Sequence, residues 1–325
     1  MKKIYGNEQL LATLSNMVKC GRTAHAVMFY GEKGSGRKLM AQYYTQLLLC
    51  ESGGREPCGI CNACKNVQQG FHPDVTYAET SGKLGGYSVA TAREICSDAF
   101  IKPNNSSGRK VYIFRDCHSM DTRTQNTLLK IIEEPPEYAY FIFTCESKAD
   151  FLPTIISRCV CFGTSICTET EAEQALAECG YGKSSIDSAV DCFHGNIGMC
   201  KEYLENEELR KIVDLTKRMT DSIIYKDEYT LNTLMCTLGT KRNDVRNTLS
   251  LLDKLMRDAA VLGRDNDAPL IGCYREGAYR LASVMTPYEA AAVHRCIERA
   301  WRTVEANVNI PLALAALCGE IMECL

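Results

Sequence analysis

A glycine-rich loop at Gly31–Lys38 constrains the fold of this chain more than any other feature of its sequence. The loop directly follows the apolar run 26–30, and a helical pattern of apolar residues continues from Leu39 to Cys50. A buried strand, a glycine turn and a helix N-terminus in this order are typical of a loop that binds phosphate through backbone N–H groups. The same glycines also suit an ordinary strand-to-helix turn. The flanking strand and helix favour the phosphate-binding interpretation.

The loop lacks two side chains that ATP hydrolysis requires. Working loops of the pattern GxxxxGK, followed by Ser or Thr, place a lysine on the β- and γ-phosphates and a hydroxyl on Mg²⁺. The scaffold glycines Gly31, Gly34 and Gly36 are present, but Arg37 stands at the lysine position and Lys38 at the hydroxyl position. Lys38 is no metal ligand and would repel a cation. The sequence therefore predicts a degenerate nucleotide site without hydrolysis, and both substitutions disfavour ATP binding.

Length, charge and cysteine content limit the class of protein. The 325 residues suit two or three domains, and the net charge of -3 argues against a chain that holds nucleic acid by bulk positive charge. No run approaches the ~18 apolar residues that span a bilayer, and the first residues lack the apolar core of a signal peptide. We therefore expect a cytoplasmic protein whose 19 cysteines are mostly reduced and buried.

Four cysteines form the strongest local motif of the chain. They are Cys50, Cys58, Cys61 and Cys64, with two consecutive C-x₂-C steps. Zn²⁺ takes four thiolates in a tetrahedron, so this spacing predicts a structural zinc site closed by four protein ligands, with no catalytic water. Unligated thiols and an iron–sulfur cluster are the alternatives. Polar flanks and the lack of any other redox feature disfavour the cluster.

Short apolar runs predict a parallel β-sheet. Together with the run 26–30 they make five strands that alternate with helical patterns, which indicates a sheet covered by helices on both faces. In an NTPase the third strand would end in two acidic residues, one for Mg²⁺ and one for the attacking water. Here Asp116 is present and Cys117 replaces the second acid. The four later runs are 75–78, 111–114, 139–144 and 159–162.

Three further motifs carry a family resemblance. They are His-Pro-Asp at 72–74, Asn-Thr-Leu-Leu-Lys-Ile-Ile-Glu-Glu-Pro-Pro at 126–136, and Ser-Arg-Cys at 157–159. With the order of elements and the cysteine insert, the chain resembles the clamp-loader branch of the AAA+ ATPases over residues 4–165. The resemblance implies an α/β AAA+ P-loop domain at 1–165 with a zinc module at 50–64. A small helical lid at 166–206 and an all-α collar domain at 207–325 would follow.

The resemblance also assigns roles to single residues. Thr144, at the end of the fourth strand, matches the polar sensor that contacts the γ-phosphate in active relatives. Arg158 matches the arginine finger that one subunit offers to a neighbour's ATP, where a guanidinium can neutralise transition-state charge. A structural arginine in a turn is the alternative for Arg158. A further arginine that contacts ATP in active relatives aligns with Gly198 here.

The losses at Arg37, Lys38 and Cys117 resemble the delta-prime class of DNA polymerase III clamp-loader subunits more than the gamma/tau motor class. This resemblance implies a non-hydrolysing stator, with gamma/tau and delta subunits as partners, that helps to load the sliding clamp on primed DNA. The first alternative is an ATP-hydrolysing motor or another AAA+ DNA-remodelling ATPase, in which Lys38 would replace the missing lysine. The second is a zinc module that reads DNA, which the lack of a basic cluster around the cysteines disfavours.

Overall fold

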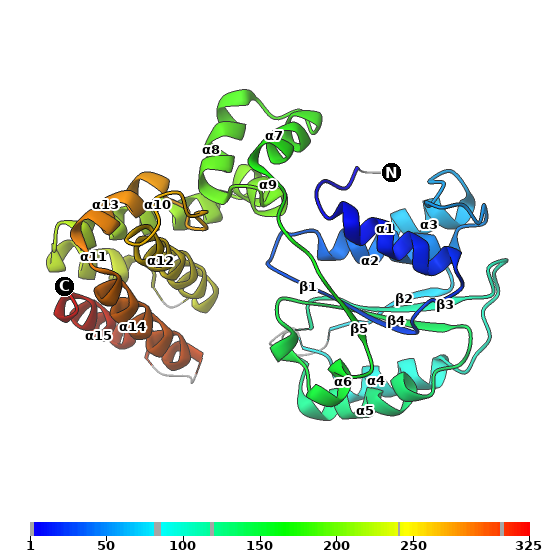
Figure 1. The fold of residues 1–325 in the computed structure, drawn as a ribbon. Helices are drawn as coiled ribbons and strands as arrows, with labels where there is room; N and C mark the ends of the chain where they lie inside the picture. The colour runs from blue at the N-terminus through cyan, green and yellow to red at the C-terminus, as the bar shows by residue number, and fades with distance from the viewer. Residues whose placement is uncertain (1–2, 81–85, 118–119, 240, 306–308) are drawn as a thin grey trace. The chain divides into compact units, whose positions relative to one another are not determined.

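The computed structural model of the chain contains two compact units, Met1–Glu171 and Ala172–Leu325 (Figure 1). It describes residues 3–80, 86–117, 120–239, 241–305 and 309–325. The predicted boundaries at 165 and 206 stay predictions, and residues 240 and 306–308 of the predicted collar domain fall outside the described ranges. Among the described helices, none combines the length and the apolar content needed to cross a membrane.

The first unit is built on a five-stranded sheet in the order β2-β3-β4-β1-β5, and each neighbouring pair is parallel. The five predicted strands are therefore confirmed. Helices cover both faces of the sheet, so side chains on either face of a strand are buried. Short continuous runs of apolar residues therefore form these strands. The strands are β1 (Ala26–Tyr30), β2 (Val75–Tyr77), β3 (Lys110–Phe114), β4 (Ala139–Cys145) and β5 (Val160–Gly163).

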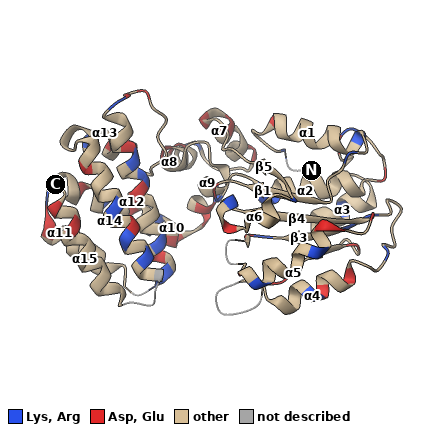
Figure 2. Ribbon diagram, turned by 60° about the horizontal axis from the view of Figure 1, so that its bottom comes forward, with Lys and Arg blue, Asp and Glu red and all other residues tan. Residues whose placement is uncertain are grey.

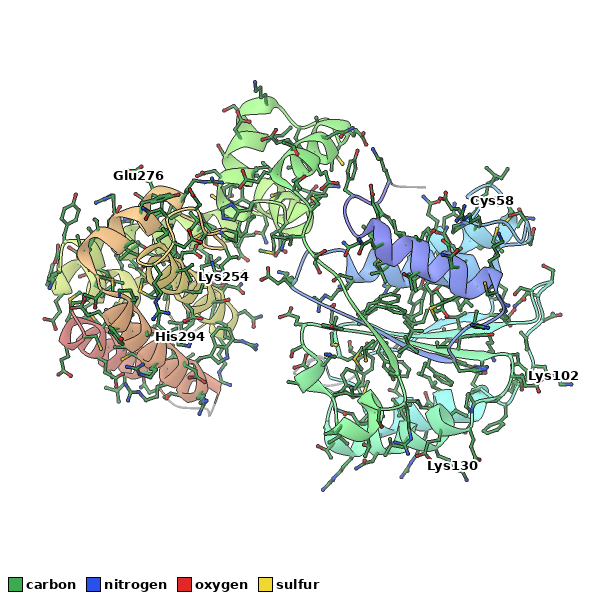
Figure 3. All side chains as sticks on the ribbon, viewed as in Figure 1. Cys58, Lys102, Lys130, Lys254, Glu276 and His294 are labelled. Carbon is green, nitrogen blue, oxygen red and sulfur yellow. The ribbon has the colours of Figure 1, made fainter. Side chains whose placement is uncertain are left out.

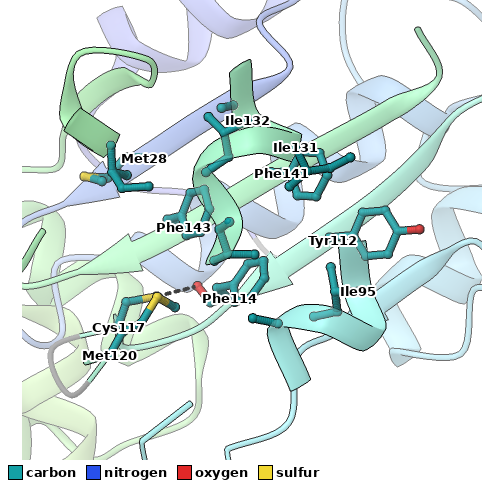
Figure 4. Packing of buried hydrophobic residues seen from close by; sticks show 14 of the residues in the cluster. Met28, Ile95, Tyr112, Phe114, Cys117, Met120, Ile131, Ile132, Phe141 and Phe143 are labelled. Carbon is teal, nitrogen blue, oxygen red and sulfur yellow. Dashed lines mark hydrogen bonds between the residues drawn. The ribbon is translucent and has the colours of Figure 1, made fainter. Parts of the chain in front are cut away.

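Two hydrophobic clusters cover the two faces of this sheet, and Figure 4 shows the one that contains Met28. Successive side chains of a strand point to opposite faces, so Val27 and Phe29 belong to one cluster and Met28 to the other. On the Met28 face the rings of Phe114 and Phe143 stack with centroids 4.9 Å apart. The first face is covered by α1 (Glu8–Lys19), α2 (Arg37–Leu49) and α3 (Asn62–Gln69), and the second by α4 (Val89–Asp98), α5 (Thr122–Glu133) and α6 (Pro153–Ile156).

The described residues of the second unit are helical and include no strand. In α12 the residues Val245, Leu249, Leu252 and Met256 recur at helical spacing and are buried, so they form core. Asp258 of the same helix is also buried, and its carboxylate accepts the N–H groups of a neighbouring loop. The helices that complete the chain are α7 (Glu169–Glu178), α8 (Lys183–Phe193), α9 (Ile197–Glu205), α10 (Glu207–Ile224), α11 (Glu228–Thr237), α12 (Arg242–Leu262), α13 (Arg275–Val284), α14 (Pro287–Glu305) and α15 (Ile310–Glu323).

Candidate functional site

The glycine loop joins β1 to α2 and depends on its glycines. Gly34 and Gly36 have φ angles of 89° and 92°, in the left-handed region that side chains other than glycine rarely adopt. A Cβ atom on Gly31 would lie 2.4 Å from Thr164 Oγ1, just after β5. The hydroxyl of Ser35 bonds the same Thr164 hydroxyl at 2.7 Å and donates to the Glu32 carbonyl. The loop is therefore tied to the edge of the sheet by contacts that the sequence pattern did not reveal.

The two cations that replace the catalytic pattern bind the acid at the end of β3. Lys38 Nζ lies 2.6 Å from Asp116 Oδ2, and Arg37 Nη2 lies 3.8 Å from Asp116 Oδ1. Arg37 is 6% exposed and also pairs with Glu146 at 3.5 Å, directly after β4. The carboxyl ends of neighbouring parallel strands meet at one edge of a sheet, which explains this convergence. Glu146 was not predicted, and only its place after a strand marks it in the sequence.

In this arrangement Asp116 is not free to bind Mg²⁺. Two cations face two carboxylates, so the formal charges of the four side chains cancel, and a metal on Asp116 would have to displace Lys38. The N–H of Ser35 donates to the Glu32 carbonyl within the loop at 3.1 Å. This N–H group is therefore not offered to a phosphate.

Thr144 and Cys117 complete the same edge of the sheet. The buried Thr144 hydroxyl accepts the N–H of Asp116 at 2.9 Å, so it braces the loop after β3, where Asp116 has a φ of 51°. Cys117 is fully buried and its thiol donates to the Phe114 carbonyl (Figure 4). Burial raises the pKa of the Cys117 thiol well above its usual value. A neutral buried thiol cannot activate water as an acidic residue would.

The four cysteines of the 50–64 segment meet in space. Their sulfur atoms all lie within 4.8 Å of one another, and Cys58 Sγ is 4.0 Å from Cys64 Sγ. A tetrahedron of four sulfurs around Zn²⁺ has edges of about 3.8 Å, so the cluster fits a single metal ion. Cys50 ends α2, Cys61 caps α3 and Cys64 lies inside α3, while Cys58 sits in the turn between them (Figure 3).

Backbone N–H groups favour thiolates in this cluster. The N–H of Cys58 donates to Cys50 Sγ, that of Cys61 to Cys58 Sγ, and that of Cys64 to Cys61 Sγ, at 3.3–3.4 Å. The N–H groups of Cys61 and Ile60 lower the pKa of Cys58 to about 6. Burial instead raises the pKa of Cys64. The donor set and its spacing thus suit a metal ion that binds four protein sulfurs and leaves no open position.

Arg158 lies in the turn between α6 and β5. Its Nη1 donates to the Thr154 carbonyl at 3.0 Å and to Ser157 Oγ at 3.2 Å, and its Nη2 forms an ion pair with Glu133 at the end of α5. The side chain is 37% exposed. The structure thus places Arg158 away from the Asp116 edge and on the surface of the first unit. Glu133 belongs to the 126–136 motif, but no sequence rule predicted its contact with an arginine 25 positions later.

Charges of both signs are interspersed over the helices, α12 and α14 included (Figure 2). On α14, for example, Arg299 pairs with Glu320 and Arg302 with Glu298. This pattern agrees with the small net charge of the chain. Gly198, at the position of the missing arginine, lies inside α9.

Comparison of the sequence with known proteins identifies its family. The sequence profile of the family described as DNA polymerase III, delta subunit, matches residues 6–181. The chain belongs to this family. The predicted resemblance to clamp-loader subunits of DNA polymerase III is thereby confirmed.

Individual relatives come from both classes of subunit. The chain is 33% identical to the tau/gamma subunit of Haemophilus influenzae over 54% of this chain and 25% of that protein. It is 32% identical to the delta' subunit of Bacillus subtilis over 46% of this chain and 45% of that protein. A gamma subunit-related protein of Thermotoga maritima aligns over 96% and 98% of the two chains with a TM-score of 0.46 and 16% identity. The matches span less than half the length of these two curated relatives, and their identities are nearly equal, so the site residues must separate the classes.

Proposed function

We propose that the chain is the delta-prime, non-hydrolysing subunit of the DNA polymerase III clamp loader, a stator within the polymerase holoenzyme. The contact between Lys38 and Asp116, at 2.6 Å, carries this proposal. In an active subunit the acid at this strand end holds Mg²⁺ and the loop cations hold phosphates. Here Arg37 and Lys38 neutralise the acid directly. The ATP-hydrolysing alternative required Lys38 to reach the phosphates, and the observed contact gives no support for that role.

In this proposal the chemistry of the chain lies at Arg158. An arginine finger stabilises the charge that develops on a phosphoryl group in a neighbouring subunit's site. The exposure of Arg158 supports such a role, because a residue that acts across a subunit boundary must reach the surface. The gamma/tau and delta subunits would be its partners, and the sliding clamp and primed DNA would be met through the assembled complex.

The remaining parts of the chain would serve assembly. We assign α7–α9 to the lid at 166–206 and α10–α15 to the collar at 207–325, since clamp-loader subunits that act on each other's ATP must be held in a ring. The four-cysteine cluster would hold a structural zinc ion, which joins the end of α2 to the start of α3. Zinc in a closed site of four thiolates supplies folding energy and no catalysis.

ATP hydrolysis by the isolated chain tests the proposal. We expect no phosphate release above background, with or without primed DNA, because Mg²⁺ has no free carboxylate and Cys117 is a buried thiol. Turnover near ~1 s⁻¹, at the low end of ordinary enzymes, would support the motor alternative if the Gly36→Val variant abolished it.

Metal content tests the zinc assignment. We expect one zinc per chain after purification and its loss in a Cys61→Ser, Cys64→Ser double variant. The matched control is the Cys20→Ser variant, because Cys20 is an exposed free cysteine of the same unit outside the cluster. Less than about half an equivalent of zinc in the wild type, or full retention in the double variant, contradicts the assignment.

A further inference from the structure

Residues of the same chain bind the terminal nitrogens of the Arg158 guanidinium, which are the atoms that a phosphate would contact. Both terminal nitrogens are engaged: Nη1 by the Thr154 carbonyl and Ser157 Oγ, and Nη2 by the carboxylate of Glu133. Thr154 lies four residues before Arg158, so the side chain folds back over α6 instead of extending from it. The Nε atom has no hydrogen-bond partner among the described residues.

The two elements that carry this contact are fixed to each other by the buried side chain of Gln125. Its Nε2 donates to the Asp150 carbonyl at 3.0 Å, and its Oε1 accepts the N–H of Leu152 at 2.7 Å. Gln125 belongs to α5, and Leu152 is the residue that precedes α6. Ile155 of α6 is buried in the core cluster beside α5. Glu133 and Arg158 therefore meet because the fold places them there, and not through a chance approach of two mobile loops.

The position of Glu133 at the end of α5 favours a nearby cation. It is the last residue of α5, and Pro135 and Pro136 prevent the helix from continuing. A carboxylate at a helix C-terminus faces the negative end of the helix dipole, which disfavours it unless a positive group lies close. Arg158 supplies that group.

We propose that Glu133 restrains Arg158 in a retracted position and competes with the phosphate of the neighbouring subunit for the same guanidinium. This inference rests on the finger role proposed above for Arg158. Carboxylate and phosphate oxygens bind a guanidinium through the same planar N–H groups, so a phosphate that takes Nη1 and Nη2 must displace Glu133 from Nη2 and the Thr154 and Ser157 contacts from Nη1. A phosphate group engages the finger only when it binds the finger better than Glu133 does. Glu133 thereby becomes the residue that sets how much negative charge a neighbouring site must present.

The ion pair is weak enough for such an exchange. The side chains of Arg158 and Glu133 are 37% and 44% exposed, and ion pairs at this exposure contribute little to stability. A buried pair would hold the finger permanently. The retracted state of Arg158 competes with the state in which Arg158 contacts a phosphate. Removal of the Glu133 carboxylate therefore raises the fraction of Arg158 that contacts the phosphate, by a factor that the strength of the ion pair sets.

The experiment compares ATP hydrolysis by the reconstituted clamp loader with four forms of this chain. They are the wild type, Glu133→Gln, Arg158→Ala and the double variant. Glu134→Gln is the matched control, because Glu134 is the C-cap of the same helix, carries the same charge and forms no side-chain hydrogen bond or ion pair within the described residues. Assembly of each complex is checked by gel filtration. The rate that Arg158→Ala removes defines the part of hydrolysis that depends on the finger.

We expect Glu133→Gln to raise this finger-dependent rate about 1.5-fold to fivefold, the range that exposed ion pairs give, while Glu134→Gln matches the wild type. In the double variant the gain should vanish, which a merely structural effect of Glu133 would not produce. A Glu133→Gln rate equal to or below that of the wild type, in a complex where Arg158→Ala lowers hydrolysis, overturns the inference alone. If Arg158→Ala has no effect in an intact complex, the finger role itself fails.

Discussion

Among the described residues of the first unit, two arginines form ion pairs with carboxylates, and these arginines differ in their access to solvent. Arg37, at the glycine loop, is 6% exposed and faces Asp116 and Glu146. Arg158, after α6, is 37% exposed and faces Glu133. In the proposed function, the first contact fills the position that holds phosphate and metal in an active subunit. The second leaves the cation where another molecule can reach it.

This difference indicates where the chain can act. A buried guanidinium that pairs with carboxylates of its own chain changes partners only at a large cost of desolvation, so we expect the Arg37 contact to stabilise the loop and not to take part in hydrolysis. An exposed guanidinium exchanges partners cheaply. The chain would therefore contribute to ATP hydrolysis through a residue that it lends to a neighbour, and its own loop would serve as a fixed scaffold.

The largest expected effect follows from removal of the exposed arginine. Arg158→Ala should leave the chain folded and able to assemble, yet lower ATP hydrolysis by the reconstituted loader. An arginine finger contributes on the order of 10³-fold or more at one site, and only the site that faces this subunit should fail. Clamp loading should fall more than bulk hydrolysis if the sites act in sequence. The measurements are steady-state phosphate release and the rate of clamp loading on primed DNA.

Arg123→Ala provides the control for that variant. Arg123 is exposed near the start of α5, so the change removes the same side chain from the same unit at another place. Unchanged rates for Arg158→Ala in an intact complex would make Arg158 a structural residue. The greater exposure of Arg158 would then have no consequence for ATP hydrolysis.

The sequence predicted the sheet and the glycine loop because both depend on local patterns. Apolar runs form buried strands, and Gly34 and Gly36 meet a backbone requirement that their own positions impose. The cysteine cluster was predictable for the same reason, since its ligands lie within one short segment. The contact of Ser35 with Thr164 was not, because it joins residues 129 positions apart. The pair of Glu133 and Arg158 depends likewise on how Gln125 fixes α5 to α6, which no spacing encodes.

A smaller effect is expected at the buried contact, where it should appear as a loss of stability. Asp116→Asn keeps a residue type that tolerates the positive φ of 51° but removes the charge that balances Arg37 and Lys38. Lys38 can turn to solvent, whereas Arg37 stays buried with Glu146 alone. We expect unfolding to become easier by about 1–3 kcal/mol, the cost of a buried polar group that loses a partner. Urea unfolding of the isolated chain measures it, and a change within about 0.5 kcal/mol would show that Asp116 does not stabilise the loop.

The smallest effect should come from Glu146, and it separates the two partners of Arg37. Glu146 is 56% exposed and 3.5 Å from Arg37 Nη2, so Glu146→Gln alone should cost less than about 0.5 kcal/mol and less still in high salt. The Asp116→Asn, Glu146→Gln double variant leaves the buried guanidinium without any carboxylate. Its loss of stability should therefore exceed the sum of the two single losses by about 0.5–1 kcal/mol. Additive losses would mean that the two carboxylates do not act together on Arg37. Packing, and not its ion pairs, would then stabilise the buried Arg37 side chain.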